Sequence, residues 1–313
     1  MREIAFTTVL TAIWALITGC SHKDIYDLGE TTSRIDISIE WDRAPAASPA
    51  GMTLYFFPTS KNGKIWRFDI AGPNGGEVEI PTGYYQMIAV NNDLPSVKIS
   101  DASSFMGFTE EALGTDDALQ PAGMLYGGVI DYLEVTPCGV VYHTGEGTIK
   151  ECRLGLVRCH PDSLTTIFNV IVRNIKGFER LASAKASVSG VGRGIHIGDE
   201  ESIVNSGKYT VELALGKKGD QKSLAGSAGA FADTEIGNYS LRLLLTLKDG
   251  KKTAKTFDVS SQVVNSVYSR NVTILIDSLE IPSGDIPEPP GGDVGGIEVG
   301  VDGWENIEID LTT

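Results

Sequence analysis

The chain has 313 residues, 42% of them hydrophobic, with 41 acidic and 26 basic residues and a formal net charge of −15. This charge argues against nucleic acid or an anionic membrane surface as the binding partner, because both require basic patches. The length is sufficient for two domains.

Residues 1–19 have the form of a signal peptide. An apolar run at residues 5–17 is too short to span a bilayer as a helix and ends abruptly at Gly19-Cys20. This junction resembles the cleavage site of bacterial lipoproteins, in which the new N-terminal cysteine carries acyl chains. Each buried CH₂ contributes about 0.8 kcal/mol, so two or three chains anchor a domain durably. We expect a lipidated Cys20, followed by a polar tether at residues 20–33.

The tether carries acidic residues just after Cys20. Asp24 and Asp27 follow Lys23 and resemble the signal that sends lipoproteins of Bacteroides-type bacteria to the cell surface. A solvated linker would have the same composition, so both interpretations stay open. The expected location is the outer membrane, with the protein lipid-anchored and surface-exposed.

Strand patterns dominate residues 34–153. Alternation of Ile35, Ile37 and Ile39 with polar residues predicts a strand with one buried face. Asn62-Gly63 lies between two apolar runs and predicts a hairpin with a type I′ turn. The strand-like runs of this half are residues 35–41, 52–57, 64–70 and 84–91.

TEEALGTDDALQ, residues 109–120, is the one stretch with helical character. Thr109 can cap a helix, and Glu110-Glu111 suit its first turn. Gly114 lowers the helix propensity, so we expect a short or broken helix.

Residues 154–281 show the same strand-like alternation of apolar and polar residues. Leu241, Leu243, Leu245 and Leu247 alternate with other residues, which predicts an apolar strand face. Strands of this length and spacing predict a β-sandwich in each half, with a division near residue 153. The predicted strands of this half are residues 165–175, 185–190, 209–215, 239–250, 255–259 and 270–277, and the predicted core residues of both halves are Ile37, Leu54, Val90, Val170, Leu213, Leu243 and Ile274.

Residues 282–313 combine a linker and a strand. Pro and Gly dominate the first part, which is typical of an exposed linker. An isolated amphipathic strand cannot be stable alone and must add to a sheet of this molecule or of a neighbour. The residues of this assembly strand are Ile297, Val299, Val301, Trp304, Ile307, Ile309 and Leu311.

Three cysteines remain after cleavage: Cys138, Cys152 and Cys159. An oxidising compartment favours one disulfide among them, with Cys138 bonded to one of the other two. Three buried free thiols are the alternative.

No catalytic constellation is present in the sequence, and we expect a non-enzymatic protein without cofactor or metal. His143, Cys152, Cys159 and His160 resemble a zinc set, but the short ligand spacings of zinc sites are absent. Exposed aromatic residues would indicate glycan binding, and core packing is the alternative for each. The aromatic candidates are Trp41, Trp66, Tyr84, Tyr85 and Trp304.

Five segments together resemble the fimbrillin superfamily of Bacteroidales, in particular its FimB-type fimbrial anchor and accessory lipoproteins. These segments are IPTGYYQMIAVNN (80–92), QPAGMLYGG (120–128), KASVSGVGRGIHI (185–197), DVSSQV (258–263) and GWENIEIDL (303–311). The resemblance implies two tandem transthyretin-like β-sandwiches, at residues 34–153 and 154–281. Stalk subunits of the superfamily are cut after an arginine, and Arg34, just before the first strand, is the candidate site here.

Two functions follow from this resemblance and from the sequence. The first is a structural anchor or accessory subunit of a fimbria assembled by strand addition between subunits, which contributes to adhesion. The second is a surface lipoprotein that binds glycans or host ligands. Deletion of the tail would distinguish them, because only the first requires it for binding a partner.

Overall fold

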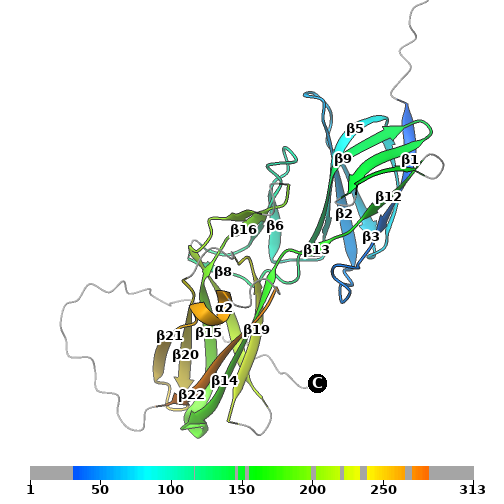
Figure 1. Cartoon of the computed structure of the whole chain (residues 1–313). Helices are drawn as coiled ribbons and strands as arrows, with labels where there is room; N and C mark the ends of the chain where they lie inside the picture. The colour runs from blue at the N-terminus through cyan, green and yellow to red at the C-terminus, as the bar shows by residue number, and fades with distance from the viewer. Residues whose placement is uncertain are drawn as a thin grey trace, which may run out of the picture.

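The computed structural model describes residues 31–281, except 116, 145–146, 152–154, 199–201, 219–221, 233–237 and 265–269. Strands make up 64% of this part of the chain and helices 4%, which confirms the predicted all-β class. Figure 1 shows an elongated molecule with two lobes. The first lobe is built from residues 32–91 and 126–163 and the second from residues 166–280, while residues 97–119 pair with strands of the second half.

Two sheets form the first lobe. The small sheet has the order β12-β1-β4, with β1 parallel to β12 and antiparallel to β4. Its strands are β1 (Thr32–Ile39), β4 (Gly75–Pro81) and β12 (Leu156–Cys159). The large sheet has the order β11-β10-β9-β5-β2-β3, with β13 (Asp162–Ser163) also paired to β9. Its other strands are β2 (Gly51–Pro58), β3 (Trp66–Ala71), β5 (Gly83–Asn91), β9 (Tyr126–Thr136), β10 (Gly139–Thr144) and β11 (Gly147–Glu151).

The second lobe also has two sheets. The larger has the order β21-β20-β15-β18-β19-β14-β22, with β8 (Ala118–Leu119) added to β18. Its strands are β14 (Thr166–Lys176), β15 (Leu181–Val191), β18 (Tyr209–Lys217), β19 (Leu224–Ala230), β20 (Ser240–Leu247), β21 (Lys252–Asp258) and β22 (Asn271–Glu280). The smaller has the order β17-β16-β7-β6, from β6 (Val97–Asp101), β7 (Thr109–Ala112), β16 (Gly194–His196) and β17 (Ser202–Val204). Two short helical segments are η1 (Phe178–Arg180) and α2 (Ser260–Val264).

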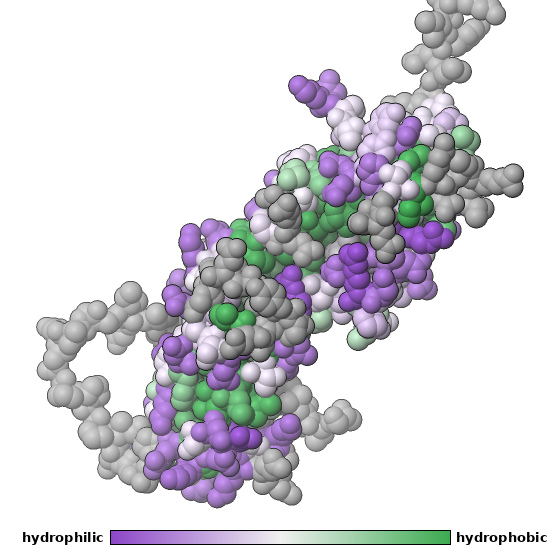
Figure 2. All heavy atoms as spheres, viewed as in Figure 1, coloured by the Kyte–Doolittle hydropathy of each residue, from purple (hydrophilic) through white to green (hydrophobic). Residues whose placement is uncertain are grey.

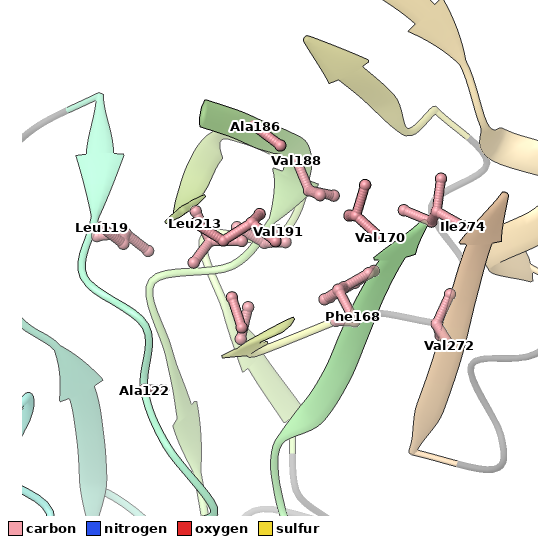
Figure 3. Close-up of a cluster of buried hydrophobic side chains, with 14 of the residues drawn as sticks. Leu119, Ala122, Phe168, Val170, Ala186, Val188, Val191, Leu213, Val272 and Ile274 are labelled. Atoms are coloured by element: carbon pink, nitrogen blue, oxygen red, sulfur yellow. The ribbon is translucent and has the colours of Figure 1, made fainter. Parts of the chain in front are cut away.

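Alternating apolar side chains build the two cores. Figure 3 shows Val170 of β14 and Ile274 of β22 in one cluster with Val188 of β15 and Leu213 of β18. The apolar face predicted from the leucines of residues 241–247 is confirmed, because all four are buried in β20. The seven predicted core residues are also confirmed as buried: Ile37, Leu54, Val90, Val170, Leu213, Leu243 and Ile274.

Strand β2 is buried on both faces. Leu54 and Phe56 lie in the core of the first lobe, whereas Tyr55 and Phe57 belong to the cluster that continues into the second lobe. The ring of Phe108, which precedes β7, lies 4.8 Å from that of Tyr55. Neighbouring β5 divides its side chains between the two clusters in the same way. Apolar packing therefore continues from one lobe to the other, and Figure 2 shows apolar surface in both lobes and near their junction.

The helix predicted at residues 109–120 is wrong. Residues 109–112 form β7, which pairs with β6 on one side and β16 on the other. These two neighbours satisfy the backbone groups that a helix would have satisfied internally, so tertiary pairing overrides local propensity. Gly114 has φ +154°, far from helical values, and a bridge to Leu119 brings the chain back toward β8.

The predicted hairpin of β2 and β3 is confirmed, but its turn type is wrong. A type I′ turn requires positive φ at both central residues, and neither Asn62 nor Gly63 has it. The N–H of Gly63 instead donates to the carbonyl of Ser60 at 3.1 Å. The connection runs from residue 59 to residue 65, which is too long for a two-residue turn.

The division of the chain at residues 153 and 154 stays a prediction. Strand pairing crosses this point in both directions. β12 follows it but pairs with β1, whereas β7 and β8 precede it but pair with β16 and β18.

Candidate functional site

Strand β1 occupies the centre of the small sheet in the first lobe. Ile35, Ile37 and Ile39 are buried by 95% or more, so one face of the strand is committed to the core. Arg34 is the third residue of β1, and the expectation that it precedes the first strand is wrong. Its exposed side chain lies 3.5 Å from the carboxylate of Glu77 on β4. A cut after Arg34 would leave all three isoleucines attached to the protein.

Several predicted site residues lie outside the described residues. They are Cys20, Cys152, Trp304 and the rest of the assembly strand, Ile297, Val299, Val301, Ile307, Ile309 and Leu311. Lipidation and strand addition therefore stay predictions.

Cys138 and Cys159 are both free thiols in the structure. Cys138 is exposed between β9 and β10, whereas Cys159 is buried at the end of β12. Burial raises the pKa of the Cys159 thiol to about 12, so this group is uncharged and unreactive at neutral pH. A disulfide between these two residues is not formed, and the pairs that include Cys152 stay a prediction.

A pocket of about 150 Å³ lies in the first lobe, next to the point where the chain leaves this lobe for the second. At this crossing Cys159 and Pro161 pack directly on Gly128 of β9, where a Cβ would lie 2.5 Å from the Cys159 sulfur. On one side of β9, the pairs with β10 end at Leu133 and the pairs with β13 lie at Tyr126 and Gly127. The described residues of β9 between Gly127 and Leu133 therefore have no registered partner in either strand. The pocket is lined by Arg43, Gly127, Gly128, Val129, Ile130, His143, Arg158, Cys159, His160 and Asp162.

Ion pairs organise the rim of this pocket. Nη1 of Arg43 lies 3.1 Å from Oδ2 of Asp162, which ties the segment after β1 to β13. Nδ1 of His160 lies 2.8 Å from Oδ1 of Asp42, and this hydrogen bond is the main reason that the pKa of Asp42 is lowered. The backbone N–H of Arg158 donates to the Tyr142 hydroxyl at 3.2 Å.

An aromatic row, exposed at Tyr84 and His143 and half-buried at Tyr132, runs from β5 across β9 to β10, next to the pocket. The rings of Tyr84 and Tyr132 lie 6.1 Å apart, and those of Tyr132 and His143 are stacked at 4.5 Å. Tyr84 is 52% exposed. The sequence reasoning missed Tyr132, because a register shift against β5 turns both Asp131 and Tyr132 outward and breaks the alternation.

The other described aromatic candidates have structural roles. Nε1 of Trp41 donates to the carbonyl of Pro73 at 2.9 Å, and the hydroxyl of Tyr85 donates to the carbonyl of Pro81 at 2.9 Å. Trp66 packs against the core of the first lobe. These three residues therefore have the packing role that was the alternative to glycan binding. Tyr84 alone of the described candidates is exposed.

The described members of the zinc set come close together without forming a metal site. His143, Cys159 and His160 all line the pocket, but within the described part of the chain no three His, Cys, Asp or Glu side chains are arranged to hold a metal ion. Among the same residues, no helix is long and apolar enough to span a membrane.

These features define an all-β protein of two sandwich-like lobes, in which the first and last described strands, β1 and β22, each form a parallel pair with another strand of their lobe. The chain belongs to the DUF5119 family, described as a domain of unknown function, whose model matches residues 19–212. A relative from Bacteroides ovatus, provisionally named fimbrium anchoring subunit Fim4B, is 24% identical over an alignment of 353 positions, gaps included, that covers 96% of each chain.

Crystal structures of two candidate adhesins from Bacteroides ovatus share this fold. The first is 20% identical, with a TM-score of 0.62, and the match covers 85% of this chain and 99% of that one. The second is 8% identical, with a TM-score of 0.52, and the match covers 81% and 91% of the two chains.

Proposed function

We propose that this protein is a non-enzymatic surface lipoprotein that anchors a fimbria, or serves as its accessory subunit, and thereby contributes to adhesion. The observation that carries the proposal is the match to a provisional fimbrium anchoring subunit over 96% of both chains. A match of this extent spans both lobes and runs into the segments that precede and follow them. The acidic charge of the chain agrees with protein partners rather than nucleic acid.

Attachment to the outer membrane occurs through acyl chains on Cys20. Cys20→Ala should release the protein into the soluble fraction or leave its signal peptide uncut. Cys138→Ala is the matched control, because this exposed cysteine lies far along the chain from the cleavage site and should leave fractionation unchanged. Full retention of Cys20→Ala in the membrane fraction would contradict lipidation.

The position of β1 favours an anchor over a stalk subunit. A subunit that accepts a neighbour's strand in place of β1 must first lose the apolar residues of that strand. Cleavage after Arg34 removes only Thr32, Ser33 and Arg34 from β1 and leaves its buried isoleucines in the sheet. A subunit that keeps its first strand cannot accept a neighbour's strand in the place of β1. It therefore terminates the fimbria at this position and must join its neighbour through another element.

The tail strand is that element. Residues 297–311 pair with a fimbrial subunit or, in its absence, with an open sheet edge of the second lobe. β22 offers such an edge outside Leu275, whose backbone already bonds Gln262 of α2, because it is the outer strand of its sheet and directly precedes the tail. β-Augmentation of this kind uses backbone hydrogen bonds for affinity and alternate side chains for specificity.

The test is co-purification of fimbrial subunits with the full chain and with a chain that lacks residues 291–313. The deletion should keep both lobes folded and lose the subunits. Ile307→Ser with Ile309→Ser and Leu311→Ser should have the same effect, because it removes the apolar face. Glu308→Gln with Asp310→Asn is the matched control on the opposite face and should retain the subunits. Retention of all partners by the deleted chain would exclude the tail as the assembly element, and unfolding would make it part of the second lobe.

A further inference from the structure

We infer that the pocket between β9, β10 and β12 binds a carboxylate-bearing sugar, such as the uronic acid unit of an acidic glycan. This inference does not depend on the anchoring function, because the pocket lies in the first lobe and uses no residue of the tail. It gives the chain a recognition site in addition to its proposed role in assembly.

The size of the pocket limits the ligand to one ring. Its volume is about 150 Å³, and an enclosed cavity of about 150 Å³ holds one benzene ring. Pockets for larger ligands measure roughly 300–1,000 Å³. Further units of a glycan would extend outward over the surface, where His143 is exposed.

The charge of the lining favours an anion. The lining carries two guanidinium groups, of Arg43 and Arg158, and one carboxylate, that of Asp162, while His143 and His160 add ring nitrogens, that of His160 bonded to Asp42 at the rim. This basic cluster lies in a chain of net charge −15. Arg43 contacts Asp162 through Nη1, and the planar guanidinium carries five N–H groups in a fork that matches a carboxylate.

The ring of His143 supplies the surface that a sugar requires. One face of this ring is stacked on Tyr132 at 4.5 Å, so the imidazole is held in place beside the pocket. The apolar C–H face of a pyranose packs well on such a ring. Tyr84, at the far end of the aromatic row and 52% exposed, is placed to contact a neighbouring sugar unit. Glu134, whose carboxylate accepts from the Tyr132 hydroxyl at 3.4 Å, can accept from sugar hydroxyl groups.

Backbone geometry completes the site. Gly127 and Gly128 form part of the lining, and between Gly128 and Tyr132 the registered strand pairs of β9 with β10 and β13 are interrupted in the described part of the chain. This stretch of β9 still pairs with β5 on its other side, so only the peptide groups that point away from β5 can bond sugar hydroxyls. The combination of guanidinium groups, a ring wall and accessible peptide groups is suited to a sugar acid and poorly suited to a simple apolar ligand.

Ligand-observed saturation-transfer NMR with the full chain tests this site, using D-glucuronate as probe and D-glucose and acetate as references. We expect glucuronate to bind with a Kd of about 1 mM. Arg43→Gln, Arg158→Gln and His143→Ala should each weaken binding at least about tenfold. Arg242→Gln, on the exposed face of β20 in the second lobe, is the matched control and should leave binding unchanged.

Circular dichroism of each variant confirms that it is folded, and His143→Ala keeps the test valid if an arginine variant unfolds. Binding of glucose as tight as that of glucuronate would overturn the role of the carboxylate. Binding of acetate as tight as that of glucuronate would overturn the role of the sugar ring. Undiminished binding by all three folded pocket variants, or no binding of glucuronate at 10-fold above the expected Kd of about 1 mM, would overturn the site itself.

Discussion

The side chain of Gln262 bonds both backbone groups of Leu275. Oε1 of Gln262 accepts from the Leu275 N–H at 2.8 Å, and Nε2 donates to the Leu275 carbonyl at 3.4 Å. Leu275 lies in β22, the outer strand of its sheet, whose other side pairs with β14. A glutamine of α2 thus takes the place of a neighbouring strand at one position of this edge, which is one way in which proteins protect an edge from unwanted pairing.

Replacement of Gln262 should weaken the second lobe and expose its edge. Gln262→Leu leaves the amide and carbonyl of Leu275 without this partner, and the free energy of unfolding should fall by about 1–3 kcal/mol. Urea unfolding measures this loss. Gln120→Leu, an exposed glutamine elsewhere, should change stability by less than about 0.5 kcal/mol. Equal stability of both variants would show that the two bonds contribute nothing.

Glu110 should make stability depend on pH. The residue is 4% exposed at the junction of the lobes, and burial raises its pKa to about 8. The protonated carboxyl is the form that the fold favours, so the stabilisation is complete below the ordinary pKa and is lost as pH rises toward 8. Between these values the free energy of unfolding should fall by up to about 1.4 kcal/mol per pH unit.

Glu110→Gln should abolish this dependence, because its amide has a similar shape and no charge. Denaturant unfolding at pH 5, 6, 7, 8 and 9 measures the profile. Glu179→Gln, which removes an exposed carboxylate in η1, is the control and should retain the wild-type profile. A slope in Glu110→Gln equal to that of the wild type would assign the dependence to other groups.

The two described cysteines should differ in reactivity. In the native full chain, iodoacetamide should modify exposed Cys138 rapidly and Cys159 only after unfolding, because the Cys159 thiol is buried and its raised pKa keeps it protonated. Peptide mapping by mass spectrometry identifies each site. Equal rates would contradict the burial of Cys159. Modification of Cys138 only after reduction would demonstrate the predicted disulfide with Cys152.

Gly128 and Cys159 should be energetically coupled. A Cβ at position 128 would lie 2.5 Å from the sulfur of Cys159, so Gly128→Ala should cost about 1–3 kcal/mol. Cys159→Ala removes the sulfur and creates the space that the new methyl group needs. The double variant should therefore lose less stability than the sum of the two single variants, and a double-mutant cycle measures the difference. Strict additivity would mean that the two sites relax independently.

Much of this fold follows from alternation in the sequence. The isoleucines of β1 and the leucines of β20 are each separated by two positions, and this spacing specifies a strand with one buried face whatever its neighbours are. Features that depend on pairing could not be obtained in this way. β7 is a strand because β6 and β16 lie on either side of it, and β2 is buried on both faces because residues near Phe108 cover one of them.

The pocket could not be predicted from local sequence patterns either, because it also depends on which strands lie side by side. Its lining comes from the segment after β1, from β9 and β10, and from residues 158–162, which the sequence separates widely. His143, Cys159 and His160 could be grouped from residue type alone, and they do lie together. Their role in the pocket could not be inferred, because Arg43, Arg158 and Tyr132, which accompany them there, are not related to them by any regular spacing in the sequence.

Each lobe has a parallel pair of strands between the points where the chain enters and leaves it. The chain first enters the first lobe at the N-terminal end of β1 and last leaves it beyond the C-terminal end of β12, and its final passage through the second lobe begins at β14 and ends after β22. Tension applied to the two ends of the molecule therefore acts lengthwise along both pairs, and their hydrogen bonds share the force instead of opening one after another. The nine registered pairs of β14 and β22 would have to slide together before the second lobe extended. Force spectroscopy with handles at residues 31 and 281 should record rupture at high force.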